Sequence, residues 1–210
     1  MKLVELINSK YKILKSIKQD RKTSSYIVRN MVNDKIENLV IINSDYISKK
    51  LMNFLINNFI ELSNIDTENI IKVFDFGLVN SIDNKSLTYK QYYYTSEYLE
   101  ESYEINNLIT ELSYEEIIDI YIQILRGVNY LNLRGLKYED INFKNVFLCK
   151  KHNKYKVKFK DLISIKIENL YLRGEVDGGI IFKAPEILNG EDSTIKSDIY
   201  SLGVLIYILL

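Results

Sequence analysis

The chain has 210 residues, 47% of them hydrophobic and 12% aromatic, so it can form a buried core and does not belong to the disordered class. Lysine plus arginine and aspartate plus glutamate both number 28, and this zero formal charge argues against a general binder of nucleic acids. The single cysteine, Cys149, and the single histidine, His152, exclude an internal disulfide and a Cys/His metal cluster.

The N-terminal sequence MKLVELINSK has a glutamate at position 5 and lacks an apolar run long enough for a signal peptide. No segment approaches the ~20 apolar residues that span a bilayer. We therefore expect a cytoplasmic protein that binds neither membranes nor nucleic acid.

The first hundred residues have the pattern of a β-rich lobe with one helix. Apolar positions at helical spacing predict a helix over residues 48–64. Short runs rich in β-branched and aromatic residues predict strands, at residues 11–17, 25–29, 39–42, 70–76 and 89–99.

The second half of the chain has a more helical pattern. Ser113 and Glu116 form a capping box, and the apolar stripe behind them predicts a helix of about five turns that ends near Gly135. After a loop, two short strands are expected at residues 146–150 and 156–160, and after a second loop a last helix is expected from near Ser197. A β-rich half followed by a helical half indicates a bilobal α+β fold.

Residues 130–148, YLNLRGLKYEDINFKNVFL, resemble the catalytic loop of protein kinases. That loop has the pattern His/Tyr-Arg-Asp, four further residues, and Asn. The matching residues are Tyr138-Glu139-Asp140 and Asn145, between a helix that ends in Tyr-Leu and an apolar strand.

Two later segments strengthen the resemblance to protein kinases. Asp161-Leu162-Ile163 follows Asp140 at the spacing of the magnesium-binding motif. Ala184-Pro185-Glu186 corresponds to the Ala-Pro-Glu that closes the kinase activation segment, and it contains the only alanine and the only proline of the chain. The resemblance extends over residues 10–210.

The resemblance implies a bacterial-type Ser/Thr protein kinase-like fold, with an N-lobe at residues 10–97 and a partial C-lobe at residues 98–210. The C-lobe is expected to be incomplete, because residues 197–210 match the start of its central helix. ATP and Mg²⁺ are the implied cofactors, if any are bound. The implied site residues are Asp140 as catalytic base, Asn145 and Asp161 as magnesium ligands, and Glu97, Leu99 and Phe147 as nucleotide contacts.

The sequence departs from the kinase pattern where the phosphates of ATP would bind. No glycine occurs between Ile17 and Tyr26, where the Gly-rich loop belongs. The usual strand lysine falls within residues 41–43, where no lysine occurs, and its glutamate partner aligns with Asn58. Lys22 is the one candidate for a relocated lysine, and a solvated turn residue is the alternative interpretation. Kinases that are phosphorylated in the activation loop have an arginine that binds this phosphate, and at its position this chain has Glu139.

These departures favour a pseudokinase, a regulatory or interaction domain that binds ATP weakly or not at all. We expect it to be the N-terminal module of a signalling protein, with another protein or a downstream domain of the same chain as its partner. The alternative is an atypical active Ser/Thr kinase that uses Asp140 as base.

Asp75-Phe76-Gly77 has the letters of the kinase magnesium motif but precedes Asp140 by 65 residues, whereas that motif follows the base by about twenty in the family. We therefore assign the tripeptide to the predicted strand at residues 70–76, which Gly77 is expected to end.

Overall fold

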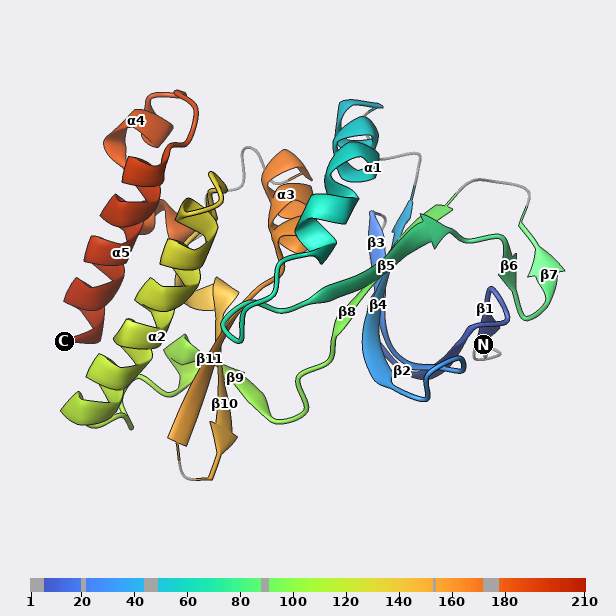
Figure 1. Ribbon diagram of the computed structural model, residues 1–210, viewed down its shortest axis with the longest axis horizontal. Helices are drawn as coiled ribbons and strands as arrows, with labels where there is room; N and C mark the ends of the chain where they lie inside the picture. The colour runs from blue at the N-terminus through green and yellow to red at the C-terminus, as the bar shows by residue number, and fades with distance from the viewer. Residues whose placement is uncertain (1–5, 20–21, 44–48, 88–90, 153, 172–177) are drawn as a thin grey trace. The chain divides into compact units, whose positions relative to one another are not determined.

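The structure is a computed structural model that describes residues 6–19, 22–43, 49–87, 91–152, 154–171 and 178–210 (Figure 1). The chain forms two compact units, Met1–Ile65 with Lys72–Tyr98, and Asp66–Ile71 with Leu99–Leu210. Residues 66–71 fall inside the predicted N-lobe range, yet they pack with the second unit. The Ile71 amide donates to the Phe159 carbonyl at 2.9 Å, and the Phe159 amide donates to the Asn69 carbonyl at 2.7 Å.

Over its described residues, the first unit is one eight-stranded antiparallel sheet with a single helix, α1 (Lys49–Ser63). The strands lie in the order β5-β8-β4-β3-β2-β1-β6-β7. Their bounds are β1 (Leu6–Ile7), β2 (Tyr11–Gln19), β3 (Thr23–Asn30), β4 (Ile36–Asn43), β5 (Val73–Leu78), β6 (Ser81–Ile82), β7 (Lys85–Ser86) and β8 (Gln91–Glu97). Residue 48 and residues 89–90, at the ends of two predicted elements, lie outside the described residues.

The sheet curls around an apolar interior, as the ribbon in Figure 1 shows for β2, β3 and β4. Alternate residues of successive strands face this interior, among them Tyr11, Val28, Leu39 and Ile41. Asn8, which follows β1, bonds to the end of β5: its side-chain amide donates to the Leu78 carbonyl at 2.7 Å, and its side-chain oxygen accepts from the Asn80 amide at 2.7 Å. The curl brings β6, which directly follows β5 in the chain, beside β1 at the opposite end of the sheet.

The opposite face of the sheet packs against α1. The Phe59 ring of α1 lies 5.5 Å from the Phe76 ring of β5, which stacks on Tyr92 of β8. At i, i+4 and i+7 of α1, Leu55 and Leu62 are buried and Phe59 is half-buried, so the predicted apolar stripe faces the sheet.

Gly77 lies inside β5, so the prediction that it ends the strand is wrong. A Cβ atom at this position would lie 3.2 Å from Cε1 of Tyr93, which is tighter than ordinary van der Waals contact. The Tyr93 hydroxyl donates to Asp75 at 2.9 Å, and this bond fixes its ring against the glycine. The glycine therefore provides space for a cross-strand tyrosine.

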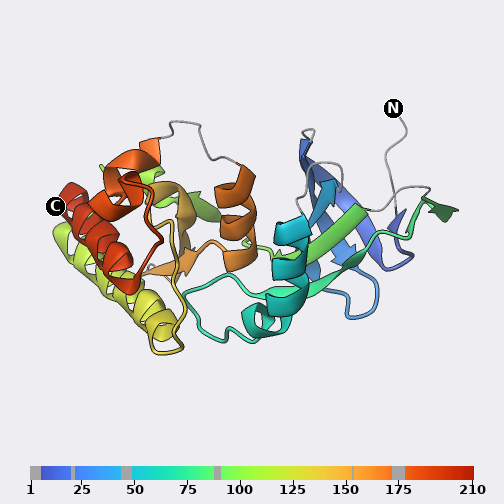
Figure 2. The same ribbon diagram turned by 90° about the horizontal axis from the view of Figure 1, so that it is seen from above.

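The second unit combines a three-stranded sheet, in the order β11-β10-β9, with helices (Figure 2). The strands are β9 (Ser102–Glu104), β10 (Val146–Lys151) and β11 (Lys154–Phe159). The α-helices are α2 (Tyr114–Asn132), α3 (Leu162–Tyr171), α4 (Pro185–Leu188) and α5 (Ile195–Leu209), and the 3₁₀ turns are η2 (Ile105–Asn107), η3 (Phe143–Asn145) and η4 (Gly178–Phe182).

Helix α2 forms as the sequence predicts. The Ser113 side chain accepts from the Glu116 amide at 3.3 Å, and the Glu116 carboxylate accepts from the Ser113 amide at 2.9 Å, which completes the capping box. The chain turns at Gly135 with a φ of +69°, a conformation that glycine adopts at little cost. The buried face of α2 packs on β11 and α5, and Tyr121 donates to the Leu202 carbonyl at 3.2 Å.

Two helices of the second unit differ from the sequence prediction. Helix α3 begins at Leu162, where a loop was expected, and its β-branched residues Ile163, Ile165 and Ile167 do not favour a helix by intrinsic propensity. Helix α5 begins at Ile195, two residues earlier than predicted, because Thr194 and Ser197 form a second capping box.

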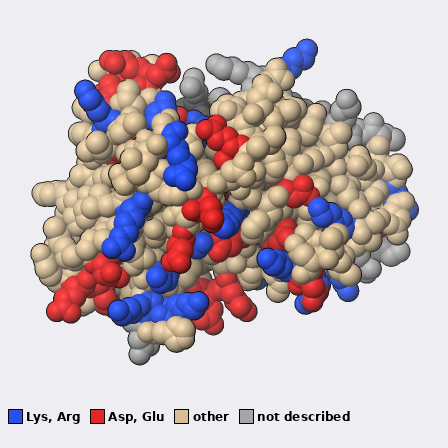
Figure 3. All heavy atoms as spheres, in the orientation of Figure 1, with Lys and Arg blue, Asp and Glu red and all other residues tan. Residues whose placement is uncertain are grey.

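Among the described helices, none has both the length and the apolar character that crossing a membrane requires. Basic and acidic side chains lie interspersed on the face of the molecule drawn in Figure 3.

Candidate active site

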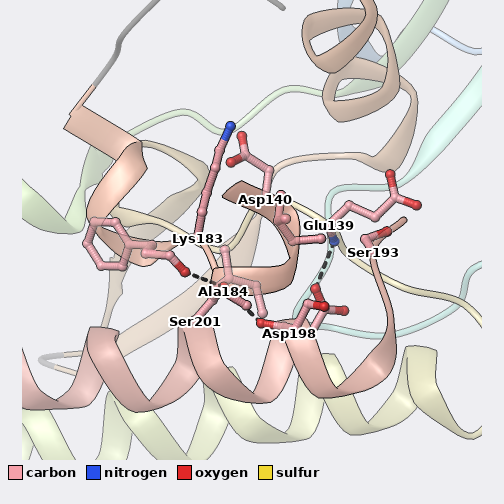
Figure 4. Close-up of a pocket in the computed structure, with 11 residues that line it drawn as sticks. Glu139, Asp140, Lys183, Ala184, Ser193, Asp198 and Ser201 are labelled. Carbon is pink, nitrogen blue, oxygen red and sulfur yellow. Dashed lines mark hydrogen bonds between the residues drawn. The ribbon is translucent and has the colours of Figure 1, made fainter. Parts of the chain in front are cut away.

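The catalytic-loop segment of the second unit is held in place by Asp198, near the start of α5. The Tyr138 amide donates to Asp198 Oδ2 at 2.7 Å. The Glu139 amide donates to Asp198 Oδ1 at 2.9 Å (Figure 4). Burial raises the pKa of Asp198, although these two backbone bonds oppose the rise. Glu139 has a φ of +74°, an uncommon conformation for a residue with a side chain, and the bonds to Asp198 stabilise it.

Tyr138 connects this loop to the end of β11. Its side chain is fully buried, its ring lies 4.8 Å from the Phe159 ring, and its hydroxyl donates to the Lys160 carbonyl at 3.0 Å. Burial keeps the pKa of the Tyr138 hydroxyl well above its ordinary value, so it remains a hydrogen-bond donor. The contact places the catalytic-loop segment beside the residue that precedes Asp161.

The structure brings together two of the predicted site residues, Asp140 and Asn145. The Asn145 amide nitrogen donates to Asp140 Oδ2 at 2.8 Å and to the Asp140 carbonyl at 2.9 Å. Burial raises the pKa of Asp140, and the side chains of Asn145 and Asn142 and the positive charge of Lys183 oppose the rise. In Figure 4 the amino end of Lys183 lies beside the Asp140 carboxylate. A carboxylate with a raised pKa suits a general base better than an ordinary one.

Asp161 caps the N-terminus of α3. Its Oδ1 accepts from the Ser164 amide at 2.8 Å, its Oδ2 accepts from the Ser164 hydroxyl at 2.7 Å, and its carbonyl accepts from the Ile165 amide at 3.2 Å. The residue is 4% exposed, and burial raises the pKa of its carboxyl group against the two bonds from Ser164.

This arrangement does not fit a magnesium site. Mg²⁺ requires closely placed oxygen ligands in octahedral geometry and retains several waters, whereas both Asp161 oxygens bond to Ser164 inside the protein. The prediction of Asp161 as a magnesium ligand therefore requires a different local conformation.

Two ion pairs attach α3 to its surroundings in the second unit. Lys166 pairs with Glu139 of the catalytic-loop segment, and Lys160 pairs with Glu168 at 2.5 Å. Glu139, which takes the position of the arginine in the kinase pattern, therefore forms an ion pair with Lys166 of the activation segment. Ser164 and Lys166 were not predicted from the sequence, although an Asp followed three positions later by Ser is a recognisable helix start.

Within residues 41–43, Ile42 is the residue at the position where the kinase pattern has its strand lysine. Leu39 and Ile41 face the interior of the curled sheet, so alternation puts Ile42 on the opposite face, where it is paired with Tyr92 beside α1. Ile42 is 0% exposed, and the side chain of Asn58 in α1 donates to the Phe54 carbonyl of its own helix at 2.7 Å. An apolar side chain therefore occupies the position of the cation.

The predicted nucleotide contacts are divided between the two units. Lys22 and Glu97 belong to the first unit, where the Lys22 carbonyl accepts from the Asn43 amide at 2.9 Å and the Glu97 amide donates to the Lys72 carbonyl at 2.8 Å. Leu99 and Phe147 belong to the second unit, where Phe147 is half-buried in β10 opposite Lys158. All four stay predictions.

The cavity behind the catalytic-loop segment has a volume of about 10 Å³, which is room for about one water molecule (Figure 4). Asp140, Lys183 and Asp198 are among the residues that line it, and the lining residue Ser201 donates its hydroxyl to the Phe182 carbonyl at 2.6 Å. This space is a packed junction between the loop and α5 and is too small for a substrate.

Solved structures and curated sequences resemble this chain in different ways. The crystal structure of the Mycobacterium tuberculosis PknI kinase domain matches with a TM-score of 0.70 at 15% identity, covering 100% of this chain and 77% of the PknI chain. Such a likeness confirms the α+β kinase-like fold.

Among curated proteins, the dual serine/threonine and tyrosine protein kinase of Xenopus tropicalis is 36% identical over 101 residues, which are 48% of this chain and 10% of that protein. Death-associated protein kinase 2 of Mus musculus is 34% identical over 108 residues, 47% of this chain and 27% of that protein. The model of the family described as protein kinase domain matches residues 99–210, more than half of the chain. The chain therefore belongs to the protein kinase domain family.

Proposed function

We propose that this chain is a pseudokinase, a regulatory or interaction domain that binds ATP and Mg²⁺ weakly or not at all. The observation that carries the proposal is the commitment of both Asp161 carboxylate oxygens to the cap of α3. Binding Mg²⁺ through Asp161 would release this cap, which costs about 0.5–2 kcal/mol for a typical helix.

The first unit supports the same proposal. A lysine in the central strand holds the phosphates in active kinases, and here Ile42 is buried at that position. Asn58, in α1, offers no charge to hold such a lysine. The interactions that position phosphates and metal are therefore weakened independently in both units.

We propose further that the domain acts in the cytoplasm as part of a signalling protein, with another protein or another domain of its own chain as the partner. Its relatives include protein kinases of much greater length, of which the chain spans about 10% and 27% in the two cases above.

A second candidate function, an atypical Ser/Thr kinase, is favoured by one specific observation. The side-chain amide nitrogen of Asn145 donates to Asp140 Oδ2 at 2.8 Å, and burial raises the pKa of Asp140, which suits a general base. In this function Asp140 would accept the proton of a protein hydroxyl as phosphate is transferred.

Thermal unfolding with ATP, with and without Mg²⁺, distinguishes the two functions. A ligand present at 100 times its dissociation constant adds about 2.7 kcal/mol, which corresponds to a Tm increase of about 5–11 °C for a chain of this size. We expect no increase at about 5 mM ATP. A magnesium-dependent increase that Asp161→Asn abolishes would contradict the pseudokinase proposal, as would phosphate transfer that Asp140→Asn abolishes.

A further inference from the structure

Apolar side chains project from the turn between β3 and β4 in the first unit. Val32 is 78% exposed and Met31 is 55% exposed, and Ile36, where β4 begins, is 42% exposed. Helix α1 follows the opposite end of β4, so it leaves this end of the sheet uncovered (Figure 1). Single exposed apolar residues are ordinary on a protein surface, whereas two consecutive large ones in one turn require an explanation.

The strand register places Ile36 in a row of side chains across the sheet. Ile36 is opposite Arg29, Arg29 is opposite Lys12, and Lys12 is opposite Leu6. Residues directly opposite each other on neighbouring strands share one face of the sheet. Tyr11, the chain neighbour of Lys12, faces the apolar interior, so this row lies on the outer face.

A surface cavity of about 310 Å³ shows which other segments lie beside the turn. Val32 and Lys35 line it from the turn, Lys10 lines it from the start of β2, and Phe74 lines it from β5. The Met31 amide also donates to the Lys10 carbonyl at 2.8 Å, which fixes the turn against the start of β2. These apolar and basic side chains therefore form one surface, the β3–β4 turn surface, consisting of Lys10, Lys12, Lys15, Arg29, Met31, Val32, Lys35, Ile36 and Phe74.

This surface carries an excess of positive charge. Residues 10–15 and 29–37 contain five basic residues and two acidic ones, although the whole chain has 28 of each kind. The acidic residues are Glu37, which is 1% exposed, and Asp34, which pairs with Arg29 at 2.8 Å. Lys10 pairs with Asp75 of β5 at 2.7 Å.

The other three lysines of the surface, Lys12, Lys15 and Lys35, are exposed. None of them forms an ion pair with a residue that the structure describes. Lys12 also lies directly opposite Arg29, and like charges at such positions destabilise a sheet. The fold alone does not account for this charge, and an anionic partner would compensate it.

A lipid surface with anionic headgroups complements both properties of this turn surface. Its phosphates attract exposed lysines, and its acyl boundary accepts apolar side chains that project from a turn. A protein partner would need a pocket shaped to receive Met31 and Val32, whereas a fluid lipid layer adapts to them. The combination of a projecting apolar turn with surrounding lysines therefore favours a membrane.

We propose that the β3–β4 turn surface attaches the first unit to an anionic membrane surface. Met31 and Val32 enter the boundary between headgroups and acyl chains, and Lys12, Lys15 and Lys35 contact the lipid phosphates. The sequence-based expectation that the chain binds no membrane considered spanning segments and overall charge, and surface attachment requires neither. The attachment is independent of nucleotide binding at the candidate active site.

Co-sedimentation of the complete 210-residue chain with lipid vesicles tests the proposal. The protein should bind vesicles that contain about 30 mol% phosphatidylserine in phosphatidylcholine, and it should not bind vesicles of phosphatidylcholine alone. Binding should weaken in about 0.5 M NaCl, because salt screens the attraction between lysines and lipid phosphates.

Two double variants assign the binding to the turn surface. Met31→Ser with Val32→Ser should raise the half-saturating lipid concentration at least about tenfold, because the buried apolar area is lost. Lys12→Gln with Lys35→Gln should raise it about 30-fold, which is about fivefold for each lysine. The matched controls are Ile60→Ser, at a residue that is 72% exposed, and Lys49→Gln, at an exposed residue. Both controls lie on α1, away from the turn, and should leave the half-saturating concentration unchanged.

Three results would overturn the proposal. The first is the absence of binding to phosphatidylserine vesicles at every lipid concentration tested. The second is binding that the Met31→Ser/Val32→Ser variant retains at full strength, or that phosphatidylcholine vesicles support equally well. The third is a dimer in analytical ultracentrifugation that this double variant dissociates, which would assign the turn surface to a second copy of the chain.

Discussion

Replacing Ser164 by alanine tests whether Asp161 is committed to capping α3. The substitution removes the hydroxyl that donates to Asp161 Oδ2 at 2.7 Å and leaves the backbone bond to Oδ1 intact. Because Asp161 is 4% exposed, water reaches Oδ2 poorly and the oxygen remains without a donor. An unsatisfied buried acceptor of this kind costs about 1–3 kcal/mol.

This loss corresponds to a Tm decrease of about 2–12 °C for a chain of this size. Differential scanning calorimetry of the wild type and the Ser164→Ala variant measures it directly. Ser86→Ala is the matched control, since Ser86 is exposed in β7 and its substitution should change stability by less than about 0.5 kcal/mol. Equal Tm values for the two variants would refute the capping role of Asp161.

Two further predictions concern pH and packing. The folded-state pKa values of Asp140, Asp161 and Asp198 are raised above 3.8, so the folded protein takes up protons before the unfolded chain does. The free energy of unfolding should therefore increase as the pH falls from neutral toward that value, and urea titrations that show a decrease at about pH 5 would contradict this. The lowered pKa values of Glu116 and Glu186 act in the opposite direction below 4.5, and that of Asp75 does so below 3.8; each stabilisation is lost as the pH falls through the folded-state pKa of the group. Gly77→Ala should destabilise the first unit by about 1–3 kcal/mol, because the added Cβ lies 3.2 Å from the Tyr93 ring; an unchanged urea midpoint would show that Tyr93 yields without strain.

Helix α2 and the long strands could be predicted because their patterns are local. The capping box at Ser113 and the stripe of Ile117, Ile120 and Ile124 describe a helix without reference to any other segment. The strands β1, β6, β7 and β9 were missed because each has two or three residues, too few to show a period. Their existence depends on partners far away in the chain, such as the pairing of Ile7 with Ile82.

For the candidate site, too, the order of residues along the chain predicted which residues take part, whereas their contacts depend on the tertiary structure. Spacing alone pointed to Asp140, Asn145 and Asp161, but it contained nothing about what their oxygens contact. The Asp161 carboxylate bonds to Ser164 only because residues 162–171 coil into α3, and the sequence analysis expected a loop there.

By itself, the sequence determined the family, the α+β order of elements, and the loss of the glycines and of the strand lysine, because these depend on residue identity and spacing. Only the tertiary structure decided that Ile42 is the residue in place of that lysine, and that the buried Oε2 of Glu37 has no donor among the residues that the structure describes. Hydrogen-bond satisfaction depends on which atoms are close together, and residues as distant in the chain as Lys10 and Asp75 meet only after the sheet has closed.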